Sequence, residues 1–587
     1  MKRSSLYLSF LILIIPLITF ITSILLRLAS GPFWQYGDPP YNYLFNAYLL
    51  VKGHCPMDTT HPGTPLQVLM AIIIWIFNLG RPASEAVNHA LINPEFYLWA
   101  VYLFLLMSSF LTSVFLAAYV YRKTNDKLAA LLTQWPQLFF LILPAIDTGN
   151  FPMLPLAADI NAEVLFIVIM NLFNLCILGL YFSKEKSKEL TFIILLAVIC
   201  GLGMALKVYF FIIMFWIFML IPHRQKALFV IIGVISFVFC TIPIISKYPQ
   251  LLGMIIDMAD HSSKYGWGPK NFVDWNSFAM NIHLMLRFDW FFIYSALGAW
   301  IWSSIHIIKD RQDRKACFVW GLSCCCLVFI AAVAKHFASR YLAPSFCLLG
   351  SIFPLIYLTE KARYKLFKPL TLAFILIFAC TCILSAIPYY KKLLTFTHDI
   401  HQFYDKVTAN YPACTIIPST TGDIDFFINE QESMHRANGT AFRVEGDDLF
   451  RLYPNSYYFF SEEVTSPLNN ESYGIWNYKQ RVLGDDIINS CPCAIFIKYV
   501  SDFSAYPYQV HLIDQSKYLN AYLLINSTEK QANDLFSQSM ESFKKGDYQQ
   551  ALVLGVQSRQ LNYEPQGQLD YMLMIIYHDL LKSRGAQ

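Results

Sequence analysis

Charged residues are scarce in this chain. Asp, Glu, Lys and Arg make up 14% of its 587 residues, whereas 56% are hydrophobic. Soluble domains contain about 25% charged residues on average. The apolar residues come in runs of about 20, the length that crosses a bilayer as a helix. The composition therefore excludes an ordinary soluble globular protein and predicts a polytopic membrane protein.

The chain also lacks a large excess of positive charge, because its 44 Lys and Arg residues are nearly balanced by 40 Asp and Glu residues. The basic residues lie in short clusters between the apolar runs. This pattern is typical of membrane orientation and not of nucleic-acid binding. We therefore expect membrane lipids among the partners of the chain and no nucleic acid.

Most of the 14 cysteines lie inside apolar runs, where they behave as small apolar side chains. Cys414, Cys491 and Cys493 lie in the polar C-terminal region instead. In an oxidising compartment we expect one disulfide among these three residues, and the sequence does not fix which two form it.

The distribution of basic residues predicts the topology. Lys2 and Arg3 place the N-terminus in the cytoplasm, and the later basic clusters are expected on the same side. The first apolar run is too long for a cleaved signal peptide, so we interpret it as an uncleaved span. We predict about eleven spans, at residues 6–29, 95–121, 128–146, 162–182, 190–206, 208–222, 227–246, 289–308, 316–334, 341–359 and 369–387.

Because all basic clusters are expected on one side, the number of spans between any two of them must be even. Two details follow from this. Residues 190–222 lie between two cytoplasmic clusters and must cross twice, with a turn expected near Gly201, Gly203 and Lys207. Lys207 is then at the outer end of the bundle; the alternative is a snorkelling lysine. Residues 64–79 are too short for a span, and we expect a helix lying along the outer interface.

Three regions are expected along the chain. Residues 1–390 form an all-α transmembrane bundle with external loops at 30–94 and 247–288. Residues 400–530 mix short β-rich runs with polar helices and predict an α/β domain, which an odd number of spans places outside. Residues 531–587 form a helical hairpin that resembles one tetratricopeptide unit through three residues, Gly546, Tyr548 and Ala551.

The outer ends of the predicted helices collect acidic and basic residues. This combination suits a reaction in which a carboxylate takes a proton from a hydroxyl while cations hold a phosphate leaving group. From the first loop to the fifth, the candidates are Asp38, Asp58, His61, Asp147, Asp159, Glu163, Lys207, Asp257, Asp260, His261, Lys335, His336 and Arg340.

Each main candidate also has a simpler interpretation. Asp38 is held in a stiff turn by the prolines that follow it, and it could instead cap the next helix through an Asx turn. Arg340 in KHFASRYLAP could bind two phosphate oxygens, or belong to an interfacial cluster that anchors lipid head groups. A divalent metal would need several converging ligands, which Asp38, Asp58 and His61 could supply; we assign no cofactor.

The order of these motifs resembles the bacterial GT-C membrane glycosyltransferases. The resemblance covers residues 1–390 and rests on GDPPY after the first apolar helix, then VKGHCPMDTTHPGTPLQVL, many spans, KYGWG and KHFASRYLAP. The resemblance implies a GT-C-like catalytic bundle in the bacterial inner membrane, with the C-terminal domain in the periplasm. It also implies a polyprenyl-phosphate sugar donor and a glycan, lipid or protein acceptor.

The resemblance also implies roles for individual residues. Asp38 corresponds to the first-loop acid that acts as a base or positions the acceptor, although here a single Asp precedes two prolines in place of an acidic pair. The residues expected to bind substrate are Lys207, Lys335, His336, Arg340, Tyr341, Asp58 and His61.

Two other functions remain open from the sequence. A transporter or flippase of a lipid-linked sugar would be expected to show internal repeats and charges near the membrane midplane. The chain has no clear repeat and its polar residues cluster at the outer ends, which favours the transferase. A membrane-anchored cell-envelope assembly factor would act through the C-terminal domain alone.

Overall fold

The structure is a computed structural model, and it describes most of the bundle and parts of the C-terminal region. The described residues are 2–36, 39–56, 63–144, 154–183, 185–260, 272–335, 337–418, 451–452, 457–460, 474–476, 481–482, 484–491, 493–499, 508–527 and 529–560.

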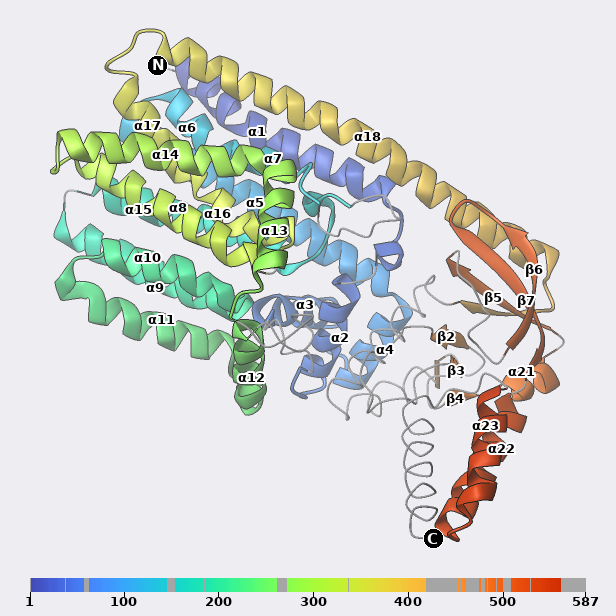
Figure 1. Ribbon diagram of the computed structural model, residues 1–587. Coiled ribbons are helices and arrows are strands. Elements are labelled where there is room, and N and C mark those ends of the chain that lie inside the picture. Colours follow the sequence, from blue (N-terminus) through green and yellow to red (C-terminus); the bar gives the residue numbers. More distant parts are fainter. Residues whose placement is uncertain are drawn as a thin grey trace. The chain divides into compact units, whose positions relative to one another are not determined.

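Long apolar helices dominate the N-terminal two thirds of the chain (Figure 1). Among the described residues, eight helical stretches are long and apolar enough to cross a membrane. The helices that form them are α1 (Lys2–Ala29, from Leu11 onward), α5 (Pro94–Thr124), α8 (Ala162–Phe182), α9 (Lys186–Leu206), α11 (Lys226–Cys240), α14 (Trp290–Lys309), α15 (Arg314–Ala334) and α18 (Phe367–Asn410). The expected polytopic helical bundle is therefore confirmed, and the chain is a multi-pass membrane protein.

A ninth crossing is formed if one bent pair counts as a single span. The 3-10 turn η7 (Ser339–Leu342) and α16 (Ala343–Cys347) precede α17 (Leu349–Glu360) with a bend of 41°.

Two predicted spans have a different local structure from the one expected. Residues 128–146 do not form one helix: α6 (Lys127–Gln134) stops before Pro136, which starts the short α7 (Pro136–Phe139). Proline has no backbone N–H to continue the ladder of α6. Residues 208–222 contain η3 (Val208–Phe210) and the short α10 (Phe211–Leu220). The total of about eleven crossings therefore stays a prediction.

The chain reverses direction at Lys207, which caps the C-terminus of α9. Gly201 and Gly203, which we expected to make this turn, lie inside the helix. A Cβ on Gly201 would lie 2.6 Å from Ser236 Cβ on α11, and one on Gly203 would lie 2.6 Å from the Phe210 ring. The glycines therefore allow close packing, and their predicted role as turn residues is wrong.

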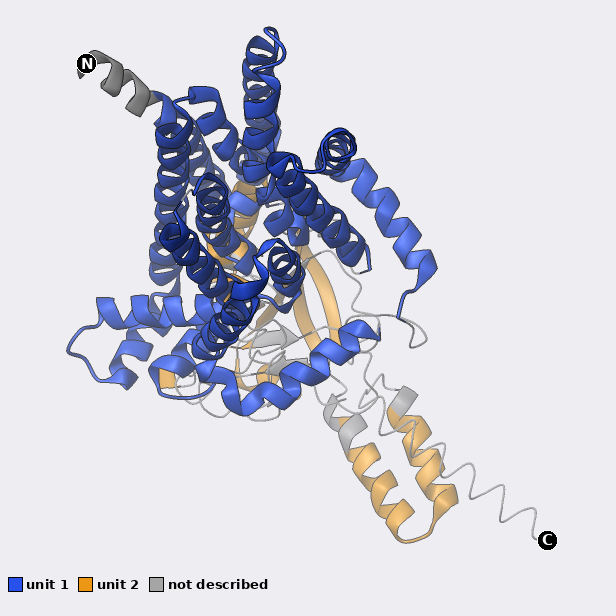
Figure 2. Ribbon diagram, turned by 90° about the vertical axis from the view of Figure 1, so that its left-hand side faces the viewer, with its two compact units in different colours: residues 1–31, 42–394 blue, residues 32–41, 395–587 orange. Residues whose placement is uncertain are grey.

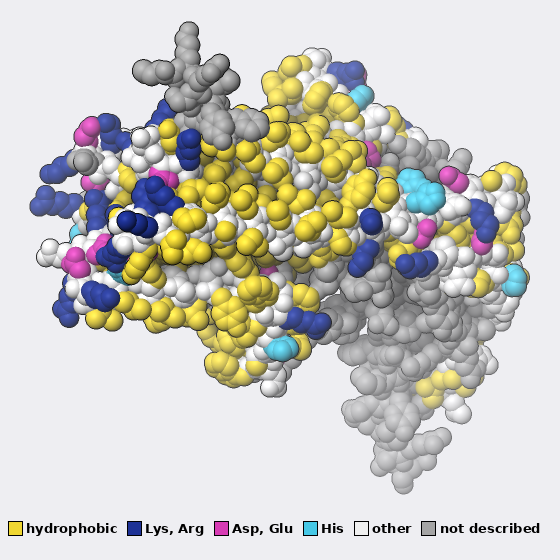
Figure 3. All heavy atoms as spheres, turned by 90° about the horizontal axis from the view of Figure 1, so that it is seen from above, with side chains coloured by type: hydrophobic (Ala, Val, Ile, Leu, Met, Phe, Trp, Pro, Cys, Tyr) yellow, Lys and Arg dark blue, Asp and Glu magenta, His cyan; other side chains and the backbone are white. Residues whose placement is uncertain are grey.

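Basic side chains mark one end of the bundle. Figure 3 shows Lys and Arg gathered at its left end, beside a broad hydrophobic surface. These side chains come from the loops after α5, α8, α14 and α17. We call this the basic end and the opposite one the distal end.

Short helices gather at the distal end. They are α2 (Pro40–Val51), α3 (Thr64–Phe77), α4 (Ala83–Ile92), α12 (Tyr248–Ala259) and α13 (Trp275–Phe288). Figure 1 shows α12 and α13 running across the direction of α14 and α15. The backbone N–H of Gly63, just before α3, donates to the Leu206 carbonyl at 3.0 Å, which ties the start of α3 to the turn at Lys207.

The chain divides into two compact units (Figure 2). The first comprises residues 1–31 and 42–394, and the second comprises residues 32–41 and 395–587. Within the second unit, the Thr397 hydroxyl donates to Gln35 Oε1 at 3.0 Å. The loop after α1 and the continuation of α18 therefore lie together within the second unit.

The described part of the second unit contains two sheets. The four-stranded sheet has the order β1-β5-β7-β6, with β1 parallel to β5 and the other pairs antiparallel. A three-stranded antiparallel sheet has the order β2-β3-β4. The strands are β1 (Thr415–Pro418), β2 (Tyr458–Phe460), β3 (Gly474–Trp476), β4 (Arg481–Val482), β5 (Ala494–Tyr499), β6 (Tyr508–Gln515) and β7 (Leu519–Ser527).

Buried apolar side chains pack the four-stranded sheet against the short α21 (Gly484–Ser490). Ile417, Ile487, Phe496 and Leu524 lie in its core. Helices α22 (Glu529–Lys544) and α23 (Tyr548–Gln560) pack as a hairpin around the buried Ala551. The α/β character of this region is confirmed, whereas the tetratricopeptide resemblance stays a prediction.

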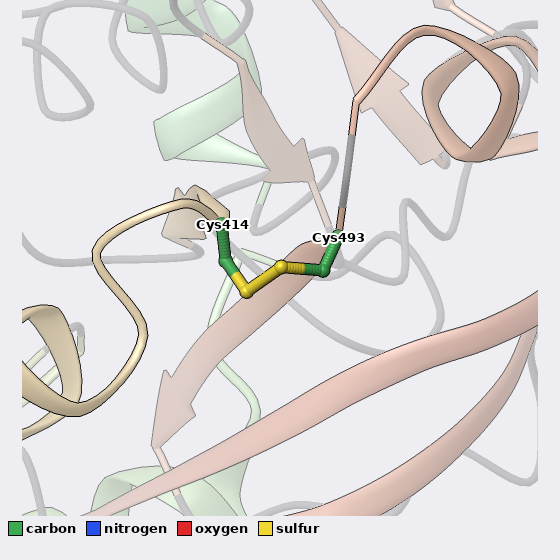
Figure 4. The surroundings of a disulfide bond; sticks show 2 residues. All are labelled: Cys414 and Cys493. Atoms are coloured by element: carbon green, nitrogen blue, oxygen red, sulfur yellow. A yellow bond between two sulfur atoms is a disulfide. The ribbon is translucent and has the colours of Figure 1, made fainter.

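A disulfide joins the start of β1 to the start of β5. It links Cys414 to Cys493, while Cys491 stays free (Figure 4). The bond closes a loop across 79 positions of sequence. The expected single disulfide is therefore present, and its pairing is now known.

Candidate active site

Three of the predicted site residues meet at the distal end. Lys207 caps α9, and Arg340 and Tyr341 lie in η7. Lys207 Nζ is 5.0 Å from the centroid of the Tyr341 ring, and Arg340 Cζ is 5.5 Å from the same centroid. The two cations therefore lie beside one aromatic ring although 133 positions separate them in the sequence.

A buried carboxylate pairs with Lys207. Glu163 Oε1 lies 2.7 Å from Lys207 Nζ, and the side chains are 2% and 6% exposed respectively. Glu163 lies in the first turn of α8, which Asn161 caps by accepting from the Val164 N–H at 2.9 Å. A negative charge at a helix N-terminus is stabilised by the helix dipole.

A second carboxylate, Asp159, lies just before α8 and is fully buried. Its Oδ2 accepts from Asn161 Nδ2 at 2.8 Å. Burial raises the pKa of Asp159 to about 6, although the Asn161 hydrogen bond and the charges of Arg27 and Arg340 pull the pKa down. The desolvation of the carboxylate thus outweighs its favourable partners. We call Asp159, Glu163, Lys207, Arg340 and Tyr341 the distal cluster.

Two buried side chains hold the loop that carries Asp159. Arg27, in the last turn of α1, donates to the Ala158 carbonyl at 3.2 Å and to the Gly31 carbonyl at 2.6 Å. The Tyr102 hydroxyl donates to the Ala157 carbonyl at 3.0 Å. The sequence analysis missed Arg27, although a single arginine near the end of an apolar helix is itself a signal of function.

Tyr209 is a further residue that the sequence analysis missed. Its ring centroid lies 5.9 Å from that of Tyr341 and 5.5 Å from that of Phe329. The hydroxyl is buried and has no hydrogen-bond partner in the part of the chain that the structure describes. Nothing in the sequence distinguishes this tyrosine from the many others in apolar runs.

Asp289 lies against the segment that carries Arg340. The Ser339 hydroxyl donates to Asp289 Oδ2 at 2.9 Å, and the carboxylate is 1% exposed. Burial raises the pKa of Asp289 to about 7, and the Ser339 hydrogen bond opposes that shift. This contact could not be predicted from the sequence, because Asp289 and Ser339 are 50 positions apart and only the fold brings them together.

Lys335 makes its contacts away from the distal cluster. Its ammonium group donates to the Ala259 carbonyl at the end of α12 and lies 4.4 Å from the Phe272 ring centroid. Burial lowers the pKa of Lys335, while the charge of Asp260 opposes that shift. The side chain thus fixes the end of α12, and Asp260 caps that helix.

Several candidates from the sequence fall outside the described residues: Asp38, Asp58, His61, Asp147, His261 and His336. Within the residues that the structure does describe, no group of three or more His, Cys, Asp or Glu side chains is placed to hold a metal ion.

No family model and no curated protein sequence matches the chain. Among solved structures, ArnT from Cupriavidus metallidurans in the apo state is 9% identical, with 86% of this chain and 97% of that chain covered and a TM-score of 0.48. ArnT bound to undecaprenyl phosphate is 10% identical, with 87% and 97% covered and a TM-score of 0.46.

The archaeal oligosaccharyltransferase AglB from Archaeoglobus fulgidus, solved with an inhibitory peptide and a dolichol-phosphate, is also similar. It is 14% identical, with 66% of this chain covered and a TM-score of 0.38. This chain spans 56% of the length of AglB.

Proposed function

We propose that the chain is a membrane glycosyltransferase that takes a sugar from a polyprenyl-phosphate donor and transfers it to an acceptor on the non-cytoplasmic face. The observation that supports this most is the convergence of Lys207 and Arg340 on Tyr341, with two buried carboxylates beside them. Buried charges within a membrane protein are costly and mark functional sites.

The distal cluster suits a phosphate leaving group. The Arg340 guanidinium has a planar fork that matches two phosphate oxygens. The Lys207 ammonium has three N–H donors, so its pairing with Glu163 at 2.7 Å leaves donors for a phosphate oxygen. Donors preorganised in this way stabilise the charge that develops on a departing phosphate.

In the proposed step, an acceptor hydroxyl oxygen attacks the anomeric carbon of the sugar. The bond from that carbon to the phosphate oxygen breaks, and its electron pair leaves with the lipid phosphate beside Lys207 and Arg340. The hydroxyl proton passes to a carboxylate, for which Asp38 remains the sequence-based candidate. Asp159 and Glu163 position the cations, because each lies within the same charged cluster.

Two observations support placing this site on the non-cytoplasmic face. The distal cluster lies at the ends of α8 and α9 and in η7, away from the basic loops, and such loops face the cytoplasm. The second unit contains the Cys414–Cys493 disulfide, and disulfides persist in oxidising compartments such as the periplasm.

The first test is mass spectrometry of the lipids that the gently purified full chain retains. We expect the wild type to carry a polyprenyl-phosphate monosaccharide and Arg340→Ala to be depleted of it. Arg287→Ala is the matched control, because Arg287 is exposed in the last turn of α13 near the same end. Equal donor on the wild type and Arg340→Ala would exclude the assigned phosphate-binding role.

A turnover assay then separates transfer from transport. With the retained donor identified, Arg340→Ala should lower turnover by about 10²–10³-fold, by analogy with other preorganised charge sites. Asp38→Asn should abolish sugar transfer while the donor still binds. If Asp38→Asn moves the lipid-linked sugar across the membrane as well as the wild type does and no transfer product forms with either protein, the chain is a transporter.

A further inference from the structure

An apolar groove lies in the bundle, and its lining includes no residue of the distal cluster. Its volume is about 460 Å³, within the range of about 300–1,000 Å³ that is typical of small-molecule sites. Helices α6, α14, α17 and α18 contribute its walls. The residues that define it here are Gly298, Trp302, Phe353, Tyr357, Phe367 and Phe374.

Most of the groove lies in the basic-end half of the bundle, and Tyr294 and Ser295 extend it into the other half of α14. Tyr357 lies one turn before the end of α17, and Phe367 is the first residue of α18. Two of its walls, α14 and α18, are long and apolar enough to cross a membrane, so we expect the groove to open toward lipid. Gly298 creates part of the hollow, since a Cβ added there would meet no atom within 4 Å.

A polar cluster lies beside the groove at Trp302. Glu360 Oε1 accepts from Trp302 Nε1 at 3.0 Å, and lies 3.3 Å from His306 Nε2 and 3.6 Å from an Arg363 nitrogen. Trp302 is therefore a wall residue that joins the groove to this cluster. The Arg363 side chain is 51% exposed, so its charge also faces outward.

The loop at this end is basic and amphipathic. Residues 361–368 read KARYKLFK, with four basic residues and no acidic one. Tyr364 and Leu366 are 61% and 72% exposed, which suits insertion among lipid head groups. Lys365 and Lys368 are exposed on either side of Phe367, which lines the groove.

We propose that this groove is a binding site for an anionic phospholipid of the leaflet at the basic end. One acyl chain fills the apolar groove, and the phosphate lies against Arg363, Lys365 and Lys368. Charge complementarity favours an anionic over a zwitterionic lipid, because basic pockets between membrane helices bind anionic head groups. This site is separate from the donor site and does not depend on the proposed transferase activity.

The test uses the full-length protein incubated with mixed micelles of equal phosphatidylglycerol and phosphatidylcholine, followed by detergent washing and mass spectrometry of retained lipid. We expect phosphatidylglycerol to be enriched on the wild type. Gly298→Phe should remove it by filling the groove, and Gly298→Leu is a milder filling variant. Gly253→Phe is the matched control, because Gly253 on α12 has equally open surroundings and does not line the groove.

The charge contribution is tested separately. Replacing Arg363, Lys365 and Lys368 by Gln should lower the preference for phosphatidylglycerol, roughly fivefold for each basic residue removed. Equal retention of both lipids by the wild type, or equal phosphatidylglycerol on the wild type and both Gly298 variants, would overturn the proposal. A polyprenyl phosphate retained from native membranes and lost in Gly298→Phe would also overturn it, since the groove would then hold the donor chain.

Discussion

At the scale of single residues, the pairing of Lys207 with Glu163 is the most consequential contact in the bundle. The two charges are almost fully buried and lie 2.7 Å apart. Removing two charges from water costs several kcal/mol each, and their attraction offsets this cost only while both are present. The pair therefore fixes the turn after α9 against the start of α8. Either charge without its partner would strongly destabilise the fold.

This coupling gives a first prediction. Glu163→Gln should destabilise the fold by about 3–5 kcal/mol, because it leaves the Lys207 ammonium buried without its counter-charge. Lys207→Met should destabilise it similarly, while the double variant should recover most of the loss. Thermal unfolding of the four proteins in one detergent measures this cycle. Additive losses in the double variant would show that the two side chains do not interact in solution.

Asp159 predicts an unusual dependence of stability on pH. Its pKa of about 6 in the folded chain lies above the ordinary value of 3.8, so the folded state holds the proton more tightly than the unfolded state. Wild-type stability should therefore rise as pH falls through 6 toward 4, whereas Asp159→Asn lacks this dependence.

We expect Asp159→Asn to unfold at a higher temperature than the wild type at pH 8, with the difference shrinking between pH 7 and pH 4. Scanning fluorimetry across this range measures it. Asp310→Asn, at an exposed loop position, is the control. A variant that is less stable than the wild type at pH 8 would mean that the carboxylate is held mainly by its charged partners.

The sequence predicted part of the candidate site and missed the rest for physical reasons. Lys207 and Arg340 could be proposed because the predicted topology places both at the outer ends of apolar runs. Their meeting at Tyr341 could not be predicted, because it depends on how the folded chain brings the turn after α9 beside η7. Arg27 and Tyr209 were missed because neither belongs to a motif, and only the folded chain places them beside Asp159 and Tyr341.

At the scale of elements, the close contact between α9 and α11 depends on a missing side chain. A Cβ on Gly201 would lie 2.6 Å from Ser236 Cβ and 2.8 Å from the Phe237 backbone nitrogen. Real Cβ contacts are longer, so the helices would have to separate. Since lipid offers no hydrophobic force between helices, small residues at such contacts determine how closely they pack.

Gly201→Ala and Gly253→Ala should therefore have opposite effects. Gly201→Ala should lower stability by about 1–3 kcal/mol through overpacking. Gly253→Ala fills open space inside α12 and should raise stability by roughly 0.5–1 kcal/mol, because alanine is the better helix former. Unfolding temperatures of both variants beside the wild type test this. A neutral Gly201→Ala would show that α9 and α11 can move apart without cost.

The elements themselves were predicted unequally. Apolar runs of about 20 residues located most long helices, because the thickness of the membrane fixes their length. Apolarity alone revealed neither the break at Pro136, which the proline itself causes, nor the 41° bend before α17. Gly201 is an example. Glycine is favoured both in turns and at close contacts between helices, and a single sequence does not show which of the two roles a given glycine has.

At the scale of the whole molecule, one hydrogen bond constrains the topology. Thr397 donates to Gln35, so the segments that follow α1 and the membrane part of α18 share one side. With one crossing by α1, we predict that the chain crosses an odd number of times as far as α18. The basic loops, which lie at the other end of the bundle, then share the side of the N-terminus, as the positive-inside rule requires.

This topology can be tested with one native and one introduced thiol. Cys491 is a free cysteine in the second unit, and Arg311 is exposed in the basic loop after α14. In intact cells, a membrane-impermeant maleimide should label Cys491, while a cysteine introduced by Arg311→Cys should react only after permeabilisation. Peptide mass spectrometry identifies the labelled site. The reverse pattern would place the Cys414–Cys493 disulfide in the reducing cytoplasm and move the distal cluster to the cytoplasmic face, which contradicts the proposed reaction on the outer side.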